Sequence, residues 1–384
     1  MIEMKKKIIK RIEAMVLLLC ILFTSAPIQP VNAATNHAEV ASNTELGVDA
    51  LIEANYAVVS KDWEEQGIGV VYGKEYTVNP VKEKTTGTIV TSNDAKDYGQ
   101  SVVRLETGDT VEFQVKAEKA GLYSIEMDYY CLSEKAVHHT ISLKVNDEYT
   151  FSEARELVLA QYYNCEEYPF RKNAAGHEIT PDAYIRYGWE HQMLRGINQG
   201  QTDGLLFYLN EGINNITVTM EKSSVLLGEI TIAAPEKVLS YAEYKALYPQ
   251  VSSTNELIAQ EAERITYKNT TAARPIGVRD VEAVPYTPNV KLMSVIGGET
   301  WNENGQTLYY EIDVEKTGWY YIGLKYKQND KANTTVYRTI TIDGKLPFAE
   351  AAEIPVECIT KWNVKTLGNE ERDFLFYLEK GTHT

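Results

Sequence analysis

Cysteine, phenylalanine and basic residues are all scarce in this 384-residue chain. It has 4 Cys with no Cys-x-x-Cys pair, and 8 Phe against 26 Tyr. It has 38 Lys and Arg against 54 Asp and Glu, a formal net charge of −16. Such an acidic excess argues against nucleic-acid binding and against docking on anionic lipid. Tyrosine combines a flat apolar face with a polar tip, which suits both strand surfaces and sugar faces.

Familiar catalytic motifs are also missing. The sequence contains no G-x-S-x-G, no P-loop, no G-x-G-x-x-G and no H-E-x-x-H among its 6 His. Carboxylates are too numerous for counting to single out a glycosidase pair. We therefore expect a chain that is not an enzyme.

Long apolar runs are absent, apart from one near the N-terminus. Ala14 to Thr24 follows a cluster of Lys and Arg and is too short to span a bilayer. Val31-Asn32-Ala33 fits a signal-peptidase site, so residues 1–33 are predicted to be a signal peptide cleaved near Ala33. Acylation at Cys20 is the alternative, although Leu19 before it is not small.

Removal of the signal peptide would leave about 350 residues, enough for two domains. Five basic and two acidic residues leave with it, so the remainder would carry about −19 and suit a secreted protein. Export would permit disulfides. Three Cys remain, and both a Cys131–Cys165 bond and buried free thiols stay open.

One segment of the sequence occurs twice. "GDTVEFQVKAEKAGLYSIEMDYY" from Gly108 aligns with "GQTLYYEIDVEKTGWYYIGLKYK" from Gly305 at a constant offset of 197 residues. The alignment continues without a gap, matching Phe151 with Phe348 and Glu153 with Glu350. Such internal similarity predicts two structural repeats.

Both repeats alternate apolar and polar residues. Val111, Phe113 and Val115 do so in the first, and so do Tyr123, Ile125, Met127 and Tyr129. This period of two, with turn residues at Asn146-Asp147 and Asp343-Gly344, predicts antiparallel strands. The expected fold is all-β, with two tandem jelly-roll or galactose-binding-like β-sandwiches.

A helix is predicted between the repeats. Ser240-Tyr241-Ala242-Glu243 fits a capping box, and Pro249 would end the helix. The predicted order is a flexible segment (34–49), a first module (50–234), a helix and linker (235–256) and a second module (257–384). The first repeat continues after Gly212 with two strand-like runs, whereas only three residues follow Gly381. We expect the second sandwich to be incomplete at its C-terminus, in a fragment, or to receive its last strands from another chain.

The second repeat resembles a known kind of module. "EAERITYKNTTAARP" (261–275), "LMSVIGGETW" (292–301), "GWYYIGLKYKQN" (318–329), "YRTITIDGKLPFAE" (337–350) and "FLFYLEKGTHT" (374–384) carry the resemblance. They resemble the N-terminal modules of large Gram-positive extracellular solute-binding proteins of carbohydrate ABC transporters. The resemblance implies galactose-binding-like sandwiches related to carbohydrate-binding modules, followed by a longer solute-binding domain.

Candidate sugar-binding residues concentrate in an insertion of about 28 residues in the first repeat, within 160–200. Aromatic rings could cover sugar C–H faces there, and long loops are often functional. An insertion that packs its own aromatic residues, or that wedges between modules, is the alternative. The candidates are Tyr162, Tyr163, Tyr168, Tyr187 and Trp189, and in the second repeat Trp301, Asn302, Trp362 and Asn363, which are expected in loops.

Glu261 and Glu263 form a candidate metal site. Carboxylates two apart on a strand project to one face, and Ca²⁺ requires several oxygen ligands. Glu261-Ala262-Glu263 resembles the opening of calcium-containing carbohydrate-binding modules, so a structural Ca²⁺ is the one cofactor suggested. The alternative is a solvated, charged start of a strand.

We expect a secreted, non-catalytic region that binds an oligo- or polysaccharide, from the N-terminal part of a solute-binding protein. Its further partner would be a transporter permease, reached through a downstream domain. Accessory modules of a polysaccharide-degrading enzyme, or a structural spacer or adhesion array, are the alternatives.

Export makes a first prediction. The protein secreted by its host should begin at Ala34, because the signal peptidase recognises the small residues of Val31-Asn32-Ala33. N-terminal sequencing with intact mass measurement checks this. A mature chain that starts at an acylated Cys20 would contradict it.

Overall fold

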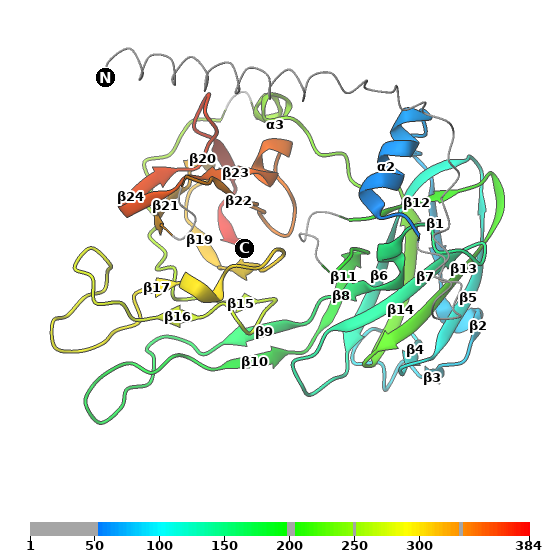
Figure 1. The fold of residues 1–384 in the computed structure, drawn as a ribbon, viewed down its shortest axis with the longest axis horizontal. Helices are drawn as coiled ribbons and strands as arrows, with labels where there is room; N and C mark the ends of the chain where they lie inside the picture. Colours follow the sequence, from blue (N-terminus) through cyan, green and yellow to red (C-terminus); the bar gives the residue numbers. More distant parts are fainter. Residues whose placement is uncertain (1–52, 198–203, 249–250, 330–332) are drawn as a thin grey trace, which may run out of the picture. The chain divides into compact units, whose positions relative to one another are not determined.

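The computed structural model describes residues 53–197, 204–248, 251–329 and 333–384. These residues belong to the compact unit Glu53–Thr384, and their regular secondary structure is almost entirely strands (Figure 1). The predicted all-β fold is confirmed. The predicted signal peptide and the 34–49 segment lie outside the described residues. No helix in the described ranges combines the length and the apolar character that a bilayer span requires.

The first repeat forms two facing sheets. The seven-stranded sheet has the order β11-β6-β14-β4-β3, with β1 paired to β14 and β12 paired to β6. The five-stranded sheet has the order β2-β5-β13-β7-β8. The strands are β1 (Glu75–Val78), β2 (Lys84–Thr85), β3 (Thr88–Val90), β4 (Val102–Leu105), β5 (Thr110–Ala117), β6 (Gly121–Cys131), β7 (His139–Val145), β8 (Leu157–Leu159), β11 (Trp189–Met193), β12 (Leu206–Leu209), β13 (Gly212–Lys222) and β14 (Val225–Ala233). The 3₁₀ turns are η1 (Pro80–Lys82) and η2 (Ser152–Arg155).

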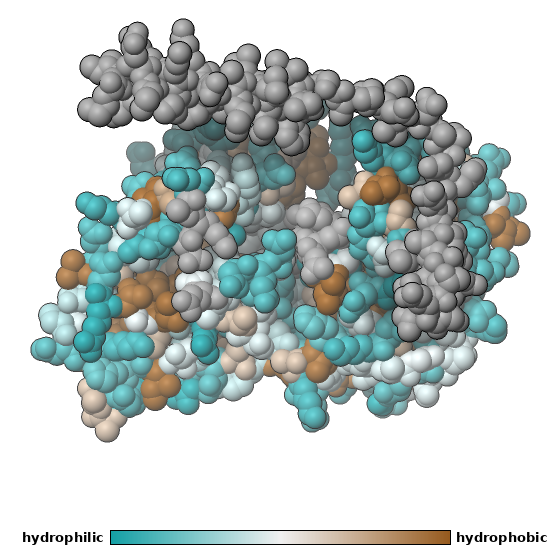
Figure 2. Space-filling model, in the orientation of Figure 1, coloured by the Kyte–Doolittle hydropathy of each residue, from teal (hydrophilic) through white to brown (hydrophobic). Residues whose placement is uncertain are grey.

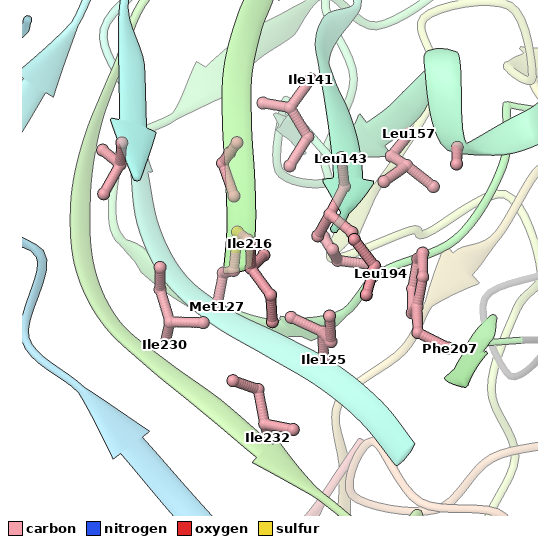
Figure 3. Packing of buried hydrophobic residues seen from close by; sticks show 14 of the residues in the cluster. Ile125, Met127, Ile141, Leu143, Leu157, Leu194, Phe207, Ile216, Ile230 and Ile232 are labelled. Carbon is pink, nitrogen blue, oxygen red and sulfur yellow. The ribbon is translucent and has the colours of Figure 1, made fainter. Parts of the chain in front are cut away.

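A single apolar core lies between these sheets. Side chains from β6, β7, β13 and β14 meet in it, among them Ile125, Ile141, Ile216 and Ile232 (Figure 3). Each of these four is at most 1% exposed. Full burial of such a side chain is worth about 1.5–3 kcal/mol. The alternation predicted for β6 therefore places every second side chain in a β-sandwich core.

The second repeat has shorter strands that pair two by two. β19 pairs with β26, β20 with β25, β21 with β24 and β22 with β23. Their bounds are β16 (Pro275–Ile276), β17 (Val295–Ile296), β19 (Ile312–Val314), β20 (Gly318–Tyr321), β21 (Gly323–Gln328), β22 (Val336–Arg338), β23 (Ile354–Val356), β24 (Ile359–Thr366), β25 (Leu375–Leu378) and β26 (Gly381–His383), with η3 (Gly298–Thr300) and η4 (Ala349–Ala352).

Each repeat begins with a helix whose N-terminus is held by a glutamate of the aligned pair. Asn55 caps α2 (Tyr56–Glu65), and the Tyr56 N–H donates to Glu153 Oε2 at 2.8 Å. In the second repeat, the Tyr241 N–H of α3 (Tyr241–Leu247) donates to Glu350 Oε2, also at 2.8 Å. A carboxylate is favoured there, because free N–H groups and the helix dipole both attract negative charge.

The same two tyrosines anchor each helix to a strand. The Tyr56 hydroxyl accepts the Leu206 N–H at 3.1 Å, and the Tyr241 hydroxyl accepts the Leu375 N–H at 2.9 Å. The Tyr56 ring packs against Phe151 at 5.0 Å between centroids, and Tyr241 packs against Phe348 at 4.9 Å. The repeats thus share tertiary contacts as well as sequence.

The helix from Ser240 is confirmed with its capping box, but its expected place is corrected. Tyr241 and Tyr244 lie in the buried cluster of Trp319, Phe348 and Phe376, so α3 belongs to the second core and not to a linker. The sequence analysis did not predict α2. The similarity between Asn55-Tyr56-Ala57 and Ser240-Tyr241-Ala242 could have indicated a helix in the first repeat as well.

The insertion of the first repeat pairs with the second repeat. β9 (Tyr162–Cys165) lies between β10 (Ala183–Arg186) and β15 (Tyr267–Lys268), and β18 (Leu308–Tyr309) pairs with β15. Tyr162 packs there against Tyr267 and Tyr309. This pairing agrees with the interpretation in which the insertion wedges between the two modules.

The three cysteines of the described residues, Cys131, Cys165 and Cys358, are free thiols. Cys131 is buried, and its Sγ lies 3.7 Å from the Ala160 carbonyl oxygen. The Cys131–Cys165 disulfide, one of the two alternatives, is not formed.

The helix contacts generate a stability prediction. Glu153→Ala and Glu350→Ala each leave a helix N–H without its acceptor and should lower the free energy of unfolding by about 1 kcal/mol. Urea denaturation of the full chain measures the change. Exposed Glu156→Ala and Glu353→Ala are the matched controls, and equal losses in all four variants would contradict the capping role.

Candidate functional site

Two of the candidate tyrosines are buried, which corrects their expected role. Tyr162 is 7% exposed and Tyr163 is 6% exposed. The Tyr163 hydroxyl donates to Gln161 Oε1 at 2.8 Å. Neither ring presents a face to solvent, and Tyr162 packs against Tyr267 and Tyr309 of the second repeat. They are packing residues in this structure.

The other insertion candidates are accessible to different degrees. Tyr168 is 50% exposed, and Arg264 lies over its ring at 4.0 Å from the centroid. Tyr187 is also 50% exposed and stacks nearly parallel to Tyr130, 17° apart with centroids separated by 6.3 Å. Trp189 is half-buried on β11, beside Tyr130.

Tyr187 and Trp189 border a group of polar side chains on the outer face of the seven-stranded sheet. On β6, Glu126, Asp128 and Tyr130 alternate with the core residues, so they face away from the core. β11 pairs beside them, with Trp189 opposite Tyr130 and His191 opposite Asp128. We call this set the aromatic–acidic face: Tyr98, Glu126, Asp128, Tyr130, Tyr187, Trp189 and His191.

His191 is held between two carboxylates. Its Nδ1 lies 2.7 Å from Asp128 Oδ1, and its Nε2 lies 2.8 Å from Glu126 Oε2. The hydrogen bond to Glu126, together with that to Asp128, raises the pKa of His191 to about 9. The imidazole is therefore protonated at neutral pH and donates from both nitrogens. Its side chain remains 58% exposed, so this fixed cation reaches solvent.

Tyr98 lies over β14 and holds the second oxygen of the Asp128 carboxylate on the neighbouring strand β6. Its hydroxyl donates to Asp128 Oδ2 at 2.6 Å and accepts the Glu229 N–H at 2.8 Å. Desolvation and the bond to Asp128 raise the pKa of Tyr98 to about 12, so the hydroxyl stays protonated. Its ring lies directly over Gly228, where a Cβ would come within 2.6 Å of it.

The indole of Trp189 completes the support. Its ring centroid lies 4.2 Å from that of Tyr98, and Nε1 donates to the Lys96 carbonyl at 2.9 Å. Trp189 therefore packs against the loop that carries Tyr98. The Tyr187 ring, which is 50% exposed, is accessible to a ligand. The site thus combines an aromatic surface with two oriented carboxylates and a cation, on rigid strands.

The second-repeat candidates lie apart from one another. Trp301 follows η3, half-buried, with Nε1 donating to the Gln306 carbonyl and Arg338 over its ring at 4.6 Å. Asn302 is exposed beside it. Trp362 and Asn363 lie within β24, and not in a loop as expected. Trp362 Nε1 donates to Asp280 Oδ2 at 2.9 Å. The face drawn in Figure 2 is mostly hydrophilic, with hydrophobic residues in separate small groups.

Glu261 and Glu263 lie at a turn and not on a strand, which corrects the geometry assumed for them. Glu263 is only 3% exposed, and its desolvation raises its pKa to about 7. Across the described residues, no three His, Cys, Asp or Glu side chains converge as a metal site would require. A Ca²⁺ at Glu261 and Glu263 stays a prediction.

No family model matches the chain, and no curated protein sequence matches it. Similar solved structures include a family 35 carbohydrate binding module from Clostridium thermocellum, at 14% identity and TM-score 0.28, covering 42% of this chain and 100% of that one. Another is the catalytic unit of a GH87 alpha-1,3-glucanase from Streptomyces thermodiastaticus, at 16% identity and TM-score 0.27, covering 49% and 31%. A third is the Podospora anserina GH26-CBM35 beta-(1,4)-mannanase, at 13% identity and TM-score 0.26, covering 46% and 36%.

The chain thus spans about a third of the length of these two hydrolases. At these TM-scores the similarities do not identify a function.

The pKa of His191 is directly testable. By ¹H–¹⁵N imidazole NMR, it should titrate near pH 9 in the full chain. Its folded pKa lies above the ordinary 6.5, so its contribution to stability is present below about pH 6.5 and is lost as pH rises through about 9. Glu126→Gln should lower the pKa, because it removes the largest stabilising bond. A pKa near 6.5 in the unmodified chain would contradict this geometry.

Proposed function

We propose that this chain is a non-catalytic, exported carbohydrate-binding region and that the aromatic–acidic face is its binding surface. It would form the N-terminal part of a solute-binding protein for carbohydrate uptake. The observation that carries the proposal is the exposed Tyr187 ring, which stacks on Tyr130, the outward-facing residue next to Asp128 along β6. The Asp128 carboxylate is already held by His191 and Tyr98.

The chemistry of the face matches that of a sugar. A pyranose has an apolar C–H face that packs on an aromatic ring and hydroxyl groups that need acceptors and donors. Tyr187 offers the ring, Glu126 and Asp128 retain lone pairs, and His191 is an exposed cation. Since the hydrogen bonds among these groups exist before binding, little side-chain entropy would be lost.

Charge narrows the ligand class. Glu126 and Asp128 carry two negative charges against the single positive charge of His191. The chain as a whole is also acidic, at −16. Acidic glycans would be repelled at long range, so neutral oligo- or polysaccharides are the expected ligands.

The transport role depends on the resemblance of the second repeat to modules of extracellular solute-binding proteins. Accessory modules of a polysaccharide-degrading enzyme would use the same face. Ligand length distinguishes the two roles. A transport protein should bind soluble oligosaccharides, whereas an accessory module of a hydrolase should favour the polymer. A spacer or adhesion array would bind neither.

Affinity electrophoresis of the full chain through gels containing neutral polysaccharides tests the proposal, with calorimetry on soluble oligosaccharides. At least one neutral glycan should bind, and Tyr187→Ala should weaken it about tenfold, which is about 1.4 kcal/mol. Tyr72→Ala, which removes a ring that is 61% exposed elsewhere, compared with 50% for Tyr187, is the matched control. Absence of binding to every glycan, or equal losses in both variants, would refute the proposal.

A further inference from the structure

Within the described part of the first repeat, the buried side chain of His139 has no hydrogen-bond partner. His139 is the first residue of β7 and lies on the core side with Ile141 and Leu143. It is 0% exposed, and neither ring nitrogen forms a hydrogen bond. The Ser224 backbone lies nearby, without the geometry of a hydrogen bond to the ring. Because buried polar groups are almost always paired, this imidazole needs an explanation.

Packing does not explain a histidine at this position. The aligned residue of the second repeat is Val336, which likewise begins a strand, β22. An apolar side chain would occupy a dry site without the cost of two unpaired ring nitrogens. What an imidazole adds is a group that gains a proton when the surroundings become mildly acidic.

Burial keeps the His139 ring neutral. Desolvation, followed by the charge of the exposed His138, lowers the pKa of His139 to about 4. β8, which pairs with His139 through Leu159, carries no titratable side chain. The other titratable side chains on the adjoining elements are Glu134 and Lys135 of the loop before β7, Glu221 and Lys222 at the end of β13, and Cys131 at the end of β6. The first four are exposed and none of the five bonds to the ring, so no described carboxylate compensates an imidazolium there.

The loop 132–138 leads directly into His139 and is held by long hydrogen bonds. The Leu132 N–H donates to the Ser224 carbonyl at 3.2 Å, and the Val137 N–H donates to Gln161 Oε1 at 3.4 Å. Gln161 Nε2 donates in turn to the Ser133 carbonyl, also at 3.4 Å. Such long bonds are weak, so this loop should open at a lower free-energy cost than the strands of the core.

The same loop supports the aromatic–acidic face. The Tyr187 hydroxyl donates to the Ser133 carbonyl at 3.5 Å. Leu132 packs in a small apolar cluster with Tyr130 and Trp189. Displacement of the loop would therefore remove contacts from the exposed ring of Tyr187 and from the residues beside it.

We propose that His139 is an acid-sensitive switch, whose protonation opens the loop 132–138 and removes its support from Tyr187. An imidazolium carries a positive charge and two N–H donors, and the closed site provides neither a counter-charge nor an acceptor. The charged ring therefore turns to water, and the loop moves with it. Release of a bound glycan in acid is the consequence, and that consequence rests on the proposed function.

The direction of the pH dependence follows from the two states of the loop. The pKa of His139 is about 4 when the ring is buried and returns to its ordinary 6.5 when the loop is open. Because burial depresses the pKa, the closed loop is fully favoured above about pH 6.5 and loses stability as the pH falls toward 4. Between these values the open population should rise about tenfold for each unit by which the pH falls.

Hydrogen exchange of the full chain, measured by mass spectrometry from pH 7 to pH 4.5, tests the switch. After correction for intrinsic exchange rates, protection of residues 132–139 should fall about 30-fold between pH 6.5 and pH 5. His139→Val, which introduces the residue of the second repeat, and His139→Gln should both abolish this fall, because neither side chain gains a proton. The exposed His138→Gln is the matched control and should retain it.

Two results would overturn the switch. One is the same pH dependence in the unmodified chain and in both His139 variants. The other is exchange of the loop that accelerates with low urea as steeply as exchange of β13, because global unfolding exposes far more surface than a local opening.

The link to the face has its own test. The neutral polysaccharide that most retards the chain in affinity gels should slow exchange of residues 132–139 about fivefold or more, because coupling between two sites is reciprocal. Unchanged loop exchange in the presence of that bound polysaccharide would refute the link. If no glycan binds, the proposed function fails, and the His139 variants alone decide whether the loop is an acid-sensitive switch.

Discussion

The strand Gly121–Cys131 is the element on which the rest of this structure depends. Because successive side chains in a strand point to opposite faces, β6 contributes to two environments at once. One face supplies Ile125, Met127 and Tyr129 to the core, and the other presents Glu126, Asp128 and Tyr130. The core thus fixes the positions of the polar residues, and the candidate site acquires rigidity from the burial behind it.

The repeat extends this constraint to the second half of the chain. β20 and β21 carry the same alternation, and the Glu350 contact reproduces that of Glu153 at the helix N-terminus. Outward residues differ, however: Asp128 and Tyr130 align with Lys325 and Lys327. The repeats therefore share a scaffold while presenting different surfaces.

Sequence patterns predicted the parts of the fold that depend on local order. Alternation gave the strands of both repeats, and the Ser240 capping box gave α3. Pairing between strands that are far apart in the sequence could not be predicted from local patterns. The burial of Tyr162 depends on Tyr267 and Tyr309, which lie more than a hundred residues away and arrive through the β9–β15 pairing. Likewise, nothing local indicates that His191 lies opposite Asp128.

A crystal structure of the chain with a bound neutral oligosaccharide tests the central claim most directly. The account predicts a sugar ring packed on the exposed face of Tyr187, with hydroxyl groups within hydrogen-bond distance of Asp128, Glu126 or His191. A sugar bound instead at Trp301 or Trp362, with the aromatic–acidic face occupied only by water, would contradict it.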